Sequence, residues 1–233
     1  MNGQPDSRLA GLVLFDFDGT LADTAPDLAA AANLQRARRG LPDLPLAQLR
    51  PVASHGARGL LRVALDMQPD HPEYEETRRR FLDDYEAAMT VHTTLFPGMD
   101  ALLDRLEANG LQWGIVTNKM ERLALPIIAH LGLTPRCAAI VCGDTTAHAK
   151  PHPLPLLHAA RLANVTPDRC VYVGDDLRDI QASRAADMPA IAAAYGYCDG
   201  GVDSWEADIN VETPEALWPA IGALLGRSAA PAT

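Results

Sequence analysis

Several features that the chain lacks narrow its class before any motif is considered. None of its 233 residues belongs to an apolar run of membrane-spanning length, and the polar residues 1–8 lack the apolar core of a signal peptide. Excess positive charge is also missing: the formal net charge is -10, which disfavours binding to a nucleic-acid backbone. We therefore expect a cytoplasmic protein that binds neither membranes nor nucleic acids.

Cysteine and lysine are both scarce. The four cysteines have no zinc-like spacing, and most lie in or beside apolar runs, so we expect them to pack as small hydrophobic residues. Lys119 and Lys150 are the only lysines among 20 basic residues. The lysine ammonium is a compact point charge, whereas the arginine guanidinium is planar and binds through several N–H groups. In such an arginine-rich chain, the two lysines are therefore candidates for a functional role.

Short apolar runs alternate with helical patterns in most of the chain. The run at residues 9–17 is continuously apolar, as expected of a central parallel strand. Further strands are expected at 112–117, 138–142, 170–173 and 190–194. Helices are expected at 99–109, 121–131, 153–163, 177–186 and 213–225. This alternation predicts an α/β fold with a Rossmann-like, doubly wound parallel sheet.

An all-helical insertion interrupts the alternation after the first strand. Helical spacing fills residues 24–39 and 44–92, and no strand is expected between Thr20 and Thr94. We therefore predict two domains: an α/β core domain, residues 1–22 and 96–233, and a helical cap domain, residues 23–95. Open parallel sheets bind ligands beyond the carboxyl ends of their strands, where such a cap would close over the site.

Two carboxylates stand at the end of the first expected strand. Asp16 and Asp18 are two residues apart, so alternation along the strand directs both to the same face. They repel each other unless a cation or a proton lies between them. Gly19 allows a sharp turn, and Thr20 adds a hydroxyl and an amide. The pattern suits metal-assisted chemistry on an anion, although solvated acidic turns and calcium loops share it.

Three more polar clusters follow the ends of later strands. They are Thr117 with Asn118, then Lys150, then Asp175 with Asp176 and Asp179. Each cluster alone has a simpler explanation, because such residues also serve as helix N-caps or solvated loop residues. Together they place acids, a hydroxyl and an ammonium group at one edge of a sheet, which independent caps would seldom do.

The charges of these clusters predict the chemistry. Asp16, Asp18 and Asp175 would repel a phosphate dianion, but Mg²⁺ binds carboxylates together with substrate phosphate oxygens. One Mg²⁺ and Lys150 would offset most of the negative charge, leaving the rest to hydrogen-bond donors. An ionised aspartate can attack phosphorus and form an aspartyl-phosphate, and a second carboxylate can protonate the leaving oxygen and then activate water.

The four motifs, in this order, resemble those of the haloacid dehalogenase superfamily of phosphohydrolases, and the helical insertion matches that family's first cap type. The resemblance covers nearly the whole chain. It implies that Asp16 is the nucleophile and Asp18 the general acid/base, while Thr117 and Lys150 hold the phosphoryl group.

The same resemblance implies a metal site and its surroundings. Mg²⁺ would be bound by Asp16, by the backbone carbonyl of Asp18 and by Asp175. Two further acids would support that site from a second layer, namely Asp176 and Asp179. Other residues are expected to bind substrate: Gly19, Thr20, Asn118, His55 and Arg58.

The residue types at key positions argue for or against other reactions known in this superfamily and against a non-enzymatic module. A dehalogenase does not use an acid two residues after its nucleophile, where this chain has Asp18. A phosphonate hydrolase of the family needs a cap lysine, and residues 20–98 contain none. A sugar phosphomutase keeps all four motifs and stays open. A signalling receiver module also presents Asp, Thr and Lys on a doubly wound sheet, but its phosphorylated Asp lies on the third strand.

Within the superfamily the chain resembles phosphoglycolate phosphatases and, as the alternative, bacterial N-acetylmuramic acid 6-phosphate phosphatases. Two segments resemble the second group: Ser-His-Gly-Ala-Arg at residues 54–58 and Gly-Asp-Asp-Leu-Arg-Asp-Ile at residues 174–180. Arg58 lies near the start of an expected helix at 57–66, where it could bind a substrate carboxylate or simply be solvated. We expect a small phosphorylated metabolite as substrate, and a monomer or a homodimer.

Overall fold

The computed structural model describes residues 11–198 and 200–228. The expectation that residues 1–8 are not a signal peptide therefore concerns residues outside the described part of the chain. Its main sheet has six strands in the order β5-β4-β1-β6-β7-β8, and every pair is parallel. The strands are β1 (Leu12–Phe15), β4 (Gln112–Val116), β5 (Ala139–Val141), β6 (Cys170–Gly174), β7 (Ala190–Ala193) and β8 (Ile209–Val211). The predicted α/β fold is confirmed. Within the described residues, no helix has the length and apolar character needed to cross a membrane.

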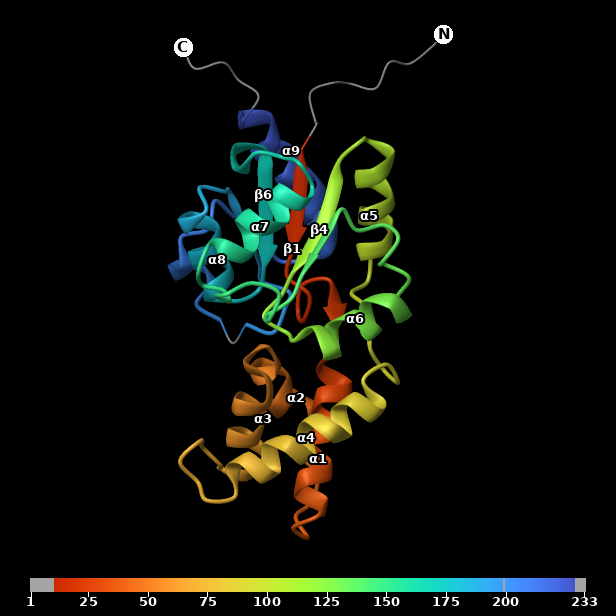
Figure 1. The fold of residues 1–233 in the computed structure, drawn as a ribbon, viewed down its shortest axis with the longest axis vertical. Coiled ribbons are helices and arrows are strands. Elements are labelled where there is room, and N and C mark those ends of the chain that lie inside the picture. The colour runs from red at the N-terminus through yellow and green to blue at the C-terminus, as the bar shows by residue number, and fades with distance from the viewer. Residues whose placement is uncertain (1–10, 199, 229–233) are drawn as a thin grey trace.

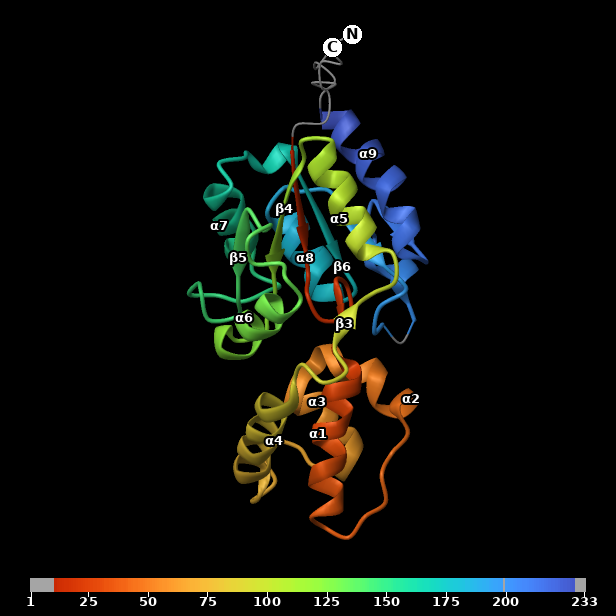
Figure 2. The same cartoon turned by 90° about the vertical axis from the view of Figure 1, so that its right-hand side faces the viewer.

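Helices cover both faces of this sheet (Figures 1 and 2). They are α5 (Met99–Ala108), α6 (Glu121–His130), α7 (Leu154–Leu162), α8 (Leu177–Ala185) and α9 (Leu217–Ser228). Val13 and Phe15 of β1 pack into the core formed with α5, α6 and α9. The alternate residues Leu12 and Leu14 pack with α7 and α8 on the other face. Because β1 is buried on both faces, its sequence is continuously apolar.

The helical insertion lies beyond the carboxyl ends of the strands (Figure 1). Its helices are α1 (Ala25–Ala37), α2 (Leu46–Leu49), a 3₁₀ helix (Arg50–His55), α3 (Gly56–Leu65) and α4 (Tyr74–Ala88). Two short antiparallel strands, β2 (Ala22–Asp23) and β3 (Thr94–Leu95), join it to the sheet. The expectation of no strand between Thr20 and Thr94 was wrong, because two-residue strands are too short to produce a periodic pattern.

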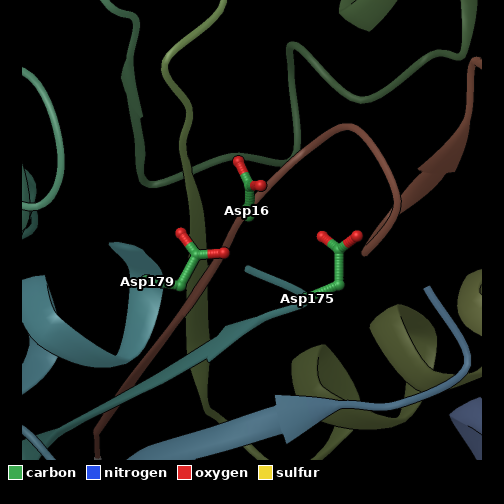
Figure 3. A group of neighbouring side chains, drawn as sticks. All are labelled: Asp16, Asp175 and Asp179. Carbon is green, nitrogen blue, oxygen red and sulfur yellow. The ribbon is translucent and has the colours of Figure 1, made fainter. Parts of the chain in front are cut away.

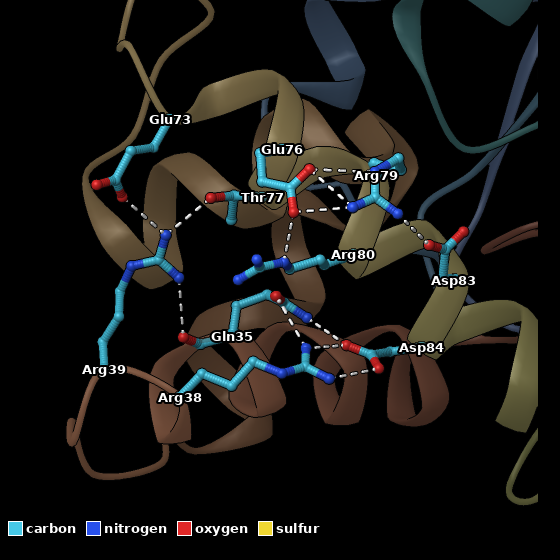
Figure 4. Close-up of polar contacts among 10 residues, drawn as sticks. All are labelled: Gln35, Arg38, Arg39, Glu73, Glu76, Thr77, Arg79, Arg80, Asp83 and Asp84. Carbon is cyan, nitrogen blue, oxygen red and sulfur yellow. Dashed lines mark hydrogen bonds and ion pairs between the residues drawn. The ribbon is translucent and has the colours of Figure 1, made fainter.

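Polar contacts join the helices of the insertion (Figure 4). Arg38, which follows α1, forms a bidentate contact with Asp84 of α4, and the second bond measures 2.8 Å. Arg39 donates to the hydroxyl of Thr77 at 2.7 Å. These contacts complement an apolar interior that includes Leu28, Leu61 and Phe81. The insertion therefore has a defined internal packing that holds α4 beside α1.

Two further expectations need correction. Residues 44–92 are not helical throughout, because Asp66 ends α3 in a left-handed conformation (φ 51°) and Pro69 and Pro72 follow before α4. Strand β8 was not predicted, since Ile-Asn-Val at a sheet edge has too few apolar residues to stand out. The final helix also begins later and extends further than expected, to Ser228.

Candidate functional site

The four polar clusters meet at one edge of the sheet. Asp16 directly follows β1, Thr117 follows β4 and Asp175 follows β6, while Lys150 lies in the loop after β5. Parallel strands bring their carboxyl ends to the same edge, so residues far apart in sequence become neighbours there. A cavity of about 320 Å³ separates this edge from the helical insertion, and Asp16 and Lys150 line it.

Three buried carboxylates form the centre of this edge (Figure 3). Asp16, Asp175 and Asp179 each offer an oxygen, and these oxygens lie within 4.8 Å of one another. Burial raises the pKa of Asp16 to about 7; Lys150 opposes this rise and Asp179 adds to it. Burial, and then the charges of Asp16 and Asp179, raise the pKa of Asp175 well above its usual value. The cluster is therefore strongly self-repelling when ionised.

Lys150 provides the positive charge beside this cluster. Its ammonium nitrogen lies 2.8 Å from Oδ1 of Asp16 and 2.7 Å from Oδ1 of Asp179. It also donates to the carbonyl of Val116 at 2.9 Å and to the hydroxyl of Tyr172 at 2.8 Å. Burial disfavours its charge, but Asp16 and Asp179 outweigh burial and raise the pKa of Lys150. The residue thus remains charged in a compact pocket of oxygens.

The carboxylate cluster fits a divalent cation. Oδ1 of Asp16 is buried and forms no aligned hydrogen bond within the described residues, although Lys150 lies close to it. One ammonium cannot balance three carboxylates, and oxygen-only ligands are those that Mg²⁺ prefers. The cluster includes Asp179 directly, whereas that residue was expected in a second layer. The expected ligand from Asp18 is its backbone carbonyl, which stays a prediction.

Asp175 is held by the turn that follows β1. Thr20 donates its hydroxyl to Oδ1 of Asp175 at 2.9 Å, and the Tyr197 amide donates to Oδ2 at 2.8 Å. Gly19 has a φ of 86°, and a Cβ there would lie 2.1 Å from Oδ2 of Asp175. Gly19 and Thr20 therefore orient the carboxylate cluster. Neither lines the 320 Å³ cavity, and their contact with substrate stays a prediction.

Asp18 also lines the cavity. Lys119, whose side chain is only 8% exposed, lies 2.9 Å from Oδ1 of Asp18. The Thr24 hydroxyl donates to the same oxygen at 2.5 Å. Asp18 and Tyr85 outweigh burial and raise the pKa of Lys119, so this second lysine is also charged. Both lysines of the chain are therefore paired with the aspartates of the first motif.

Asn118 positions the Lys150 loop. Its amide donates to the Lys150 carbonyl at 2.9 Å, and its oxygen accepts from the Lys150 amide at 2.9 Å. Thr117 accepts from the Lys119 amide at 3.1 Å, and helix α6 has Met120 at its N-cap position. The alternative explanation of Thr117 and Asn118 as caps of that helix is therefore wrong.

Asp176 does cap a helix. It occupies the N-cap position of α8 and forms a capping box with Asp179, whose Oδ2 accepts from the Asp176 amide at 3.1 Å. Arg178 binds both oxygens of Asp176 and also donates to the Ser54 carbonyl in the insertion at 3.1 Å. His55 lies 3.8 Å from Asp176. This group of residues therefore connects α8 to the helical insertion.

The insertion supplies a different wall to the cavity. Arg58 is exposed, and no residue in the described part of the chain forms an ion pair or hydrogen bond with its side chain. Arg78 lines the same wall, weakly paired with Glu75 at 3.8 Å. The remaining wall includes apolar and aromatic side chains, namely Leu28, Phe81, Leu82 and Tyr85. This wall combines cations with an apolar surface.

Sequence reasoning missed several residues that border the cavity. The scarcity of lysine marked Lys119 as a candidate functional residue, but its position in the sequence did not indicate that it would contact Asp18. Arg178 lies within the fourth motif, but no role was assigned to it. Tyr85 and Arg78 lie on α4, where their residue types are ordinary and carry no motif. Only the packing of the helices brings them to the site.

Comparison with known proteins identifies the family that shares this arrangement. The sequence pattern of the haloacid dehalogenase-like hydrolases matches residues 13–193, which include every strand-end motif described above. The chain belongs to this family. It is therefore an enzyme of the haloacid dehalogenase-like hydrolases, in agreement with the resemblance in the four motifs.

Relatives within this family are similar over almost the full chain. A phosphoglycolate phosphatase from Xanthomonas campestris pv. campestris is 51% identical over 213 residues, covering 91% of this chain and 96% of the relative. An N-acetylmuramic acid 6-phosphate phosphatase from Pseudomonas putida is 42% identical over 215 residues, again covering 91% and 96%. A crystal structure of a predicted phosphoglycolate phosphatase from Haemophilus somnus 129pt superposes with a TM-score of 0.79 at 25% identity, covering 91% of this chain and 98% of that one.

Proposed function

We propose that this haloacid dehalogenase-like hydrolase is a Mg²⁺-dependent phosphomonoesterase that acts through an aspartyl-phosphate on Asp16. The observation that carries the proposal is the buried carboxylate of Asp16, which faces a cavity between the Lys150 ammonium and two further carboxylates. The substrates are small phosphorylated metabolites. The experiment is to measure phosphate release from a panel of phosphate esters, with Mg²⁺ and then with excess EDTA.

Asp16, Asp175 and Asp179 would hold Mg²⁺, since their oxygens lie within 4.8 Å of one another and repel when ionised. The bound metal supplies positive charge that offsets both this repulsion and the phosphate dianion. Lys150 adds a fixed ammonium at the same place. We expect activity to be lost in EDTA and not to be restored by Ca²⁺, whose longer, more numerous bonds suit in-line transfer poorly.

The chain's own residues carry the proposed reaction. Asp16 attacks phosphorus, while Asp18 gives a proton to the leaving alcohol and later takes one from the attacking water. Lys150 and the groups of Thr117 stabilise the phosphoryl oxygens, and Asn118 holds the Lys150 loop in register. The Tyr172 hydroxyl and the Val116 carbonyl fix the ammonium, so little reorganisation is needed when charge develops.

We also propose that residues 23–95 act as a cap domain over a core domain formed by residues 1–22 and 96–233. Contacts across this division support the assignment: Arg178 donates to the Ser54 carbonyl at 3.1 Å, and Arg122 of α6 pairs with Glu86 of α4 at 3.0 Å. Further contacts join the two parts, such as His55 with Asp176 at 3.8 Å, and polar contacts of this kind can separate to admit substrate. Water would be excluded when the cap is closed.

The first candidate substrate is phosphoglycolate. It is supported by the 51% identity to the Xanthomonas campestris enzyme and by the cationic wall, because phosphoglycolate carries a carboxylate beside its phosphate ester. Arg58, which has no acidic partner in the described part of the chain, is the candidate that would bind this carboxylate.

A second candidate, N-acetylmuramic acid 6-phosphate, is favoured by the size and character of the cavity. A volume of about 320 Å³ lies in the range that holds ligands much larger than glycolate. Leu82, which is partly exposed on the cavity wall, offers apolar surface that a two-carbon acid would leave uncovered, whereas an acetylated sugar would cover it. The lactyl carboxylate of this substrate lies farther from the phosphate, and Arg58 and Arg78 on the insertion wall are the candidates that would bind it.

A matched substrate set separates these candidates. N-acetylglucosamine 6-phosphate has the sugar body but lacks the lactyl carboxylate, and phosphoglycolate has a carboxylate but lacks the body. The substrate with the highest kcat/KM identifies which features the cavity recognises. Release of no more than one equivalent of phosphate from every ester would overturn the proposal and favour a phosphorylated, non-enzymatic module.

A further inference from the structure

Lys119 is the one lysine for which the proposed reaction has no role. Its nearly buried ammonium lies 2.9 Å from Oδ1 of Asp18 and 4.6 Å from the centre of the Tyr85 ring. Asp18 is the residue to which the proposed reaction assigns proton transfer, and Tyr85 belongs to α4 of the helical insertion. Lys119 therefore connects the acid/base residue to the part of the chain that covers the cavity.

Two donors converge on a single oxygen of Asp18. Besides Lys119, the Thr24 hydroxyl contacts Oδ1 at 2.5 Å, while Oδ2 has no hydrogen-bond partner among residues 11–198 and 200–228. A carboxyl oxygen has two lone pairs, so both acceptor positions of Oδ1 are filled. A proton carried by Asp18 has to reside on Oδ2. The contacts thus select which oxygen exchanges protons with the substrate.

We propose that Lys119 is a positioning residue that fixes the Asp18 carboxyl group so that Oδ2 delivers the proton to the leaving oxygen. This inference rests on the proposed function. Lys119 is held in turn by the Tyr85 ring, and Thr24 stands at the N-cap position of α1, so both contacts depend on the placement of the helical insertion. Tyr85 and Thr24 thereby link the orientation of the acid/base group to the helical insertion.

The proton balance of the step is simple. An electron pair of the Asp16 carboxylate forms the bond to phosphorus as the ester P–O bond breaks. The electron pair of that broken bond stays on the alcohol oxygen, which takes the proton from Oδ2 of Asp18. In the second step, water attacks phosphorus and gives a proton to Oδ2, and the Asp16 carboxylate is restored.

Dependence on the leaving group distinguishes positioning of an acid from general structural support. An alkoxide is a poor leaving group and needs a proton, whereas p-nitrophenolate departs without one. The quantity to compare is kcat/KM, because it reports only the steps up to departure of the alcohol and excludes hydrolysis of the aspartyl-phosphate. Both test esters should lack a carboxylate, so that any contact between Lys119 and a substrate carboxylate cannot contribute.

The experiment compares glycerol phosphate with p-nitrophenyl phosphate in the wild type and in Lys119→Met, which keeps an unbranched side chain of nearly the same length and removes its charge. We expect kcat/KM for glycerol phosphate to fall about 30-fold, part of the 10²- to 10⁴-fold that general acid catalysis contributes. The value for p-nitrophenyl phosphate should fall less than about threefold. Asp18→Asn should also lower kcat/KM for glycerol phosphate more than for p-nitrophenyl phosphate, and by a larger factor than Lys119→Met. Tyr85→Leu should do the same by a smaller factor.

Arg122→Ala is the matched control, because Arg122 joins α6 to Glu86 of α4 at 3.0 Å without touching Asp18. It should leave the ratio of the two kcat/KM values unchanged. An equal loss on both esters in a folded Lys119→Met protein would overturn the proposal and assign Lys119 to closure of the insertion alone. No loss on either would overturn it as well. A wild type inactive on both esters would instead contradict the proposed function.

Discussion

The two walls of the cavity differ in how fully their charged groups are paired. At the sheet edge, Lys150 is 3% exposed and touches four oxygens, and Lys119 is 8% exposed and paired with Asp18. On the helical insertion, Arg58 is exposed and has no polar partner within the described residues. The sheet edge is therefore already organised for one reaction, whereas the insertion presents one arginine, Arg58, whose partner has to come from the substrate.

The largest effect is expected at the sheet edge. Asp16→Asn removes the nucleophile, and we expect kcat to fall by at least about 10³-fold because an amide does not attack phosphorus. Phosphate release measured with Mg²⁺ tests this, and circular dichroism shows whether the variant is folded. A folded variant that keeps more than about a tenth of the wild-type kcat would rule out the covalent mechanism.

Lys150→Arg should be nearly as damaging as Lys150→Ala. The ammonium occupies a pocket of four oxygens, at 2.7–2.9 Å, that a planar guanidinium cannot enter. We expect each variant to lower kcat/KM about 100-fold or more. An arginine variant with near wild-type kcat/KM would show that positive charge of any shape is sufficient at this position.

Substitutions on the helical insertion should weaken recognition of the substrate carboxylate and leave the phosphoryl-transfer reaction itself nearly unchanged. We expect Arg58→Ala to lower kcat/KM about 10- to 100-fold for the best carboxylate-bearing substrate, on the scale of one lost charged hydrogen bond. Hydrolysis of p-nitrophenyl phosphate, which has no carboxylate, should change about twofold or less.

Arg62→Ala is the matched control, since Arg62 lies one turn further along α3 and does not line the 320 Å³ cavity. It should leave both substrates unaffected. Equal losses on both substrates in Arg58→Ala would mean that Arg58 supports closure or folding, and the contrast between the two walls would no longer hold.

The pH dependence of Tm should distinguish the sheet edge from the helical insertion, and its measurement needs no catalytic turnover. Burial raises the pKa of Asp16 to about 7 in the metal-free protein, so the folded state holds a proton that the unfolded chain loses near pH 4. The stability that this group contributes is therefore greatest below about pH 4 and is lost as pH rises through about 7. In EDTA, we expect Tm to fall by about 5 °C between pH 5 and pH 8, from this group alone.

Asp16→Asn should flatten this pH dependence, and Mg²⁺ should restore more stability at pH 8 than at pH 5. Arg58→Ala, on the other wall, should leave the Tm profile parallel to that of the wild type. A wild-type Tm that rises between pH 5 and pH 8 in EDTA would show that the carboxylate cluster is not self-repelling.

The difference between the two walls also explains how much could be predicted from the sequence. Asp16, Thr117, Lys150 and Asp175 directly follow strands or lie in the loop after one, so the alternation of strands and helices was enough to bring them together. The parallel sheet and the helical insertion followed from the same periodicity.

Contacts that depend on helix packing could not be predicted. Tyr85 of α4 approaches the Lys119 ammonium, which the sequence does not indicate. Lys119 itself lies in the loop after β4, but its ion pair with Asp18 depends on the direction of its side chain. The role of Asp179 was only partly foreseen, because its place in the carboxylate cluster depends on the capping box that starts α8. Strand β8 and the β2–β3 pair were too short to give a pattern.

The most direct test of the proposed reaction is to locate the phosphoryl group during turnover. With p-nitrophenyl phosphate and Mg²⁺, departure of the phenol is fast, so hydrolysis of the phosphoenzyme should limit the rate and the adduct should accumulate. Peptide mapping by mass spectrometry after an acid quench should then find one phosphoryl group, on Asp16. Turnover accompanied by a phosphoryl group on a different residue, or by release of p-nitrophenol without any phosphoenzyme, would contradict the account.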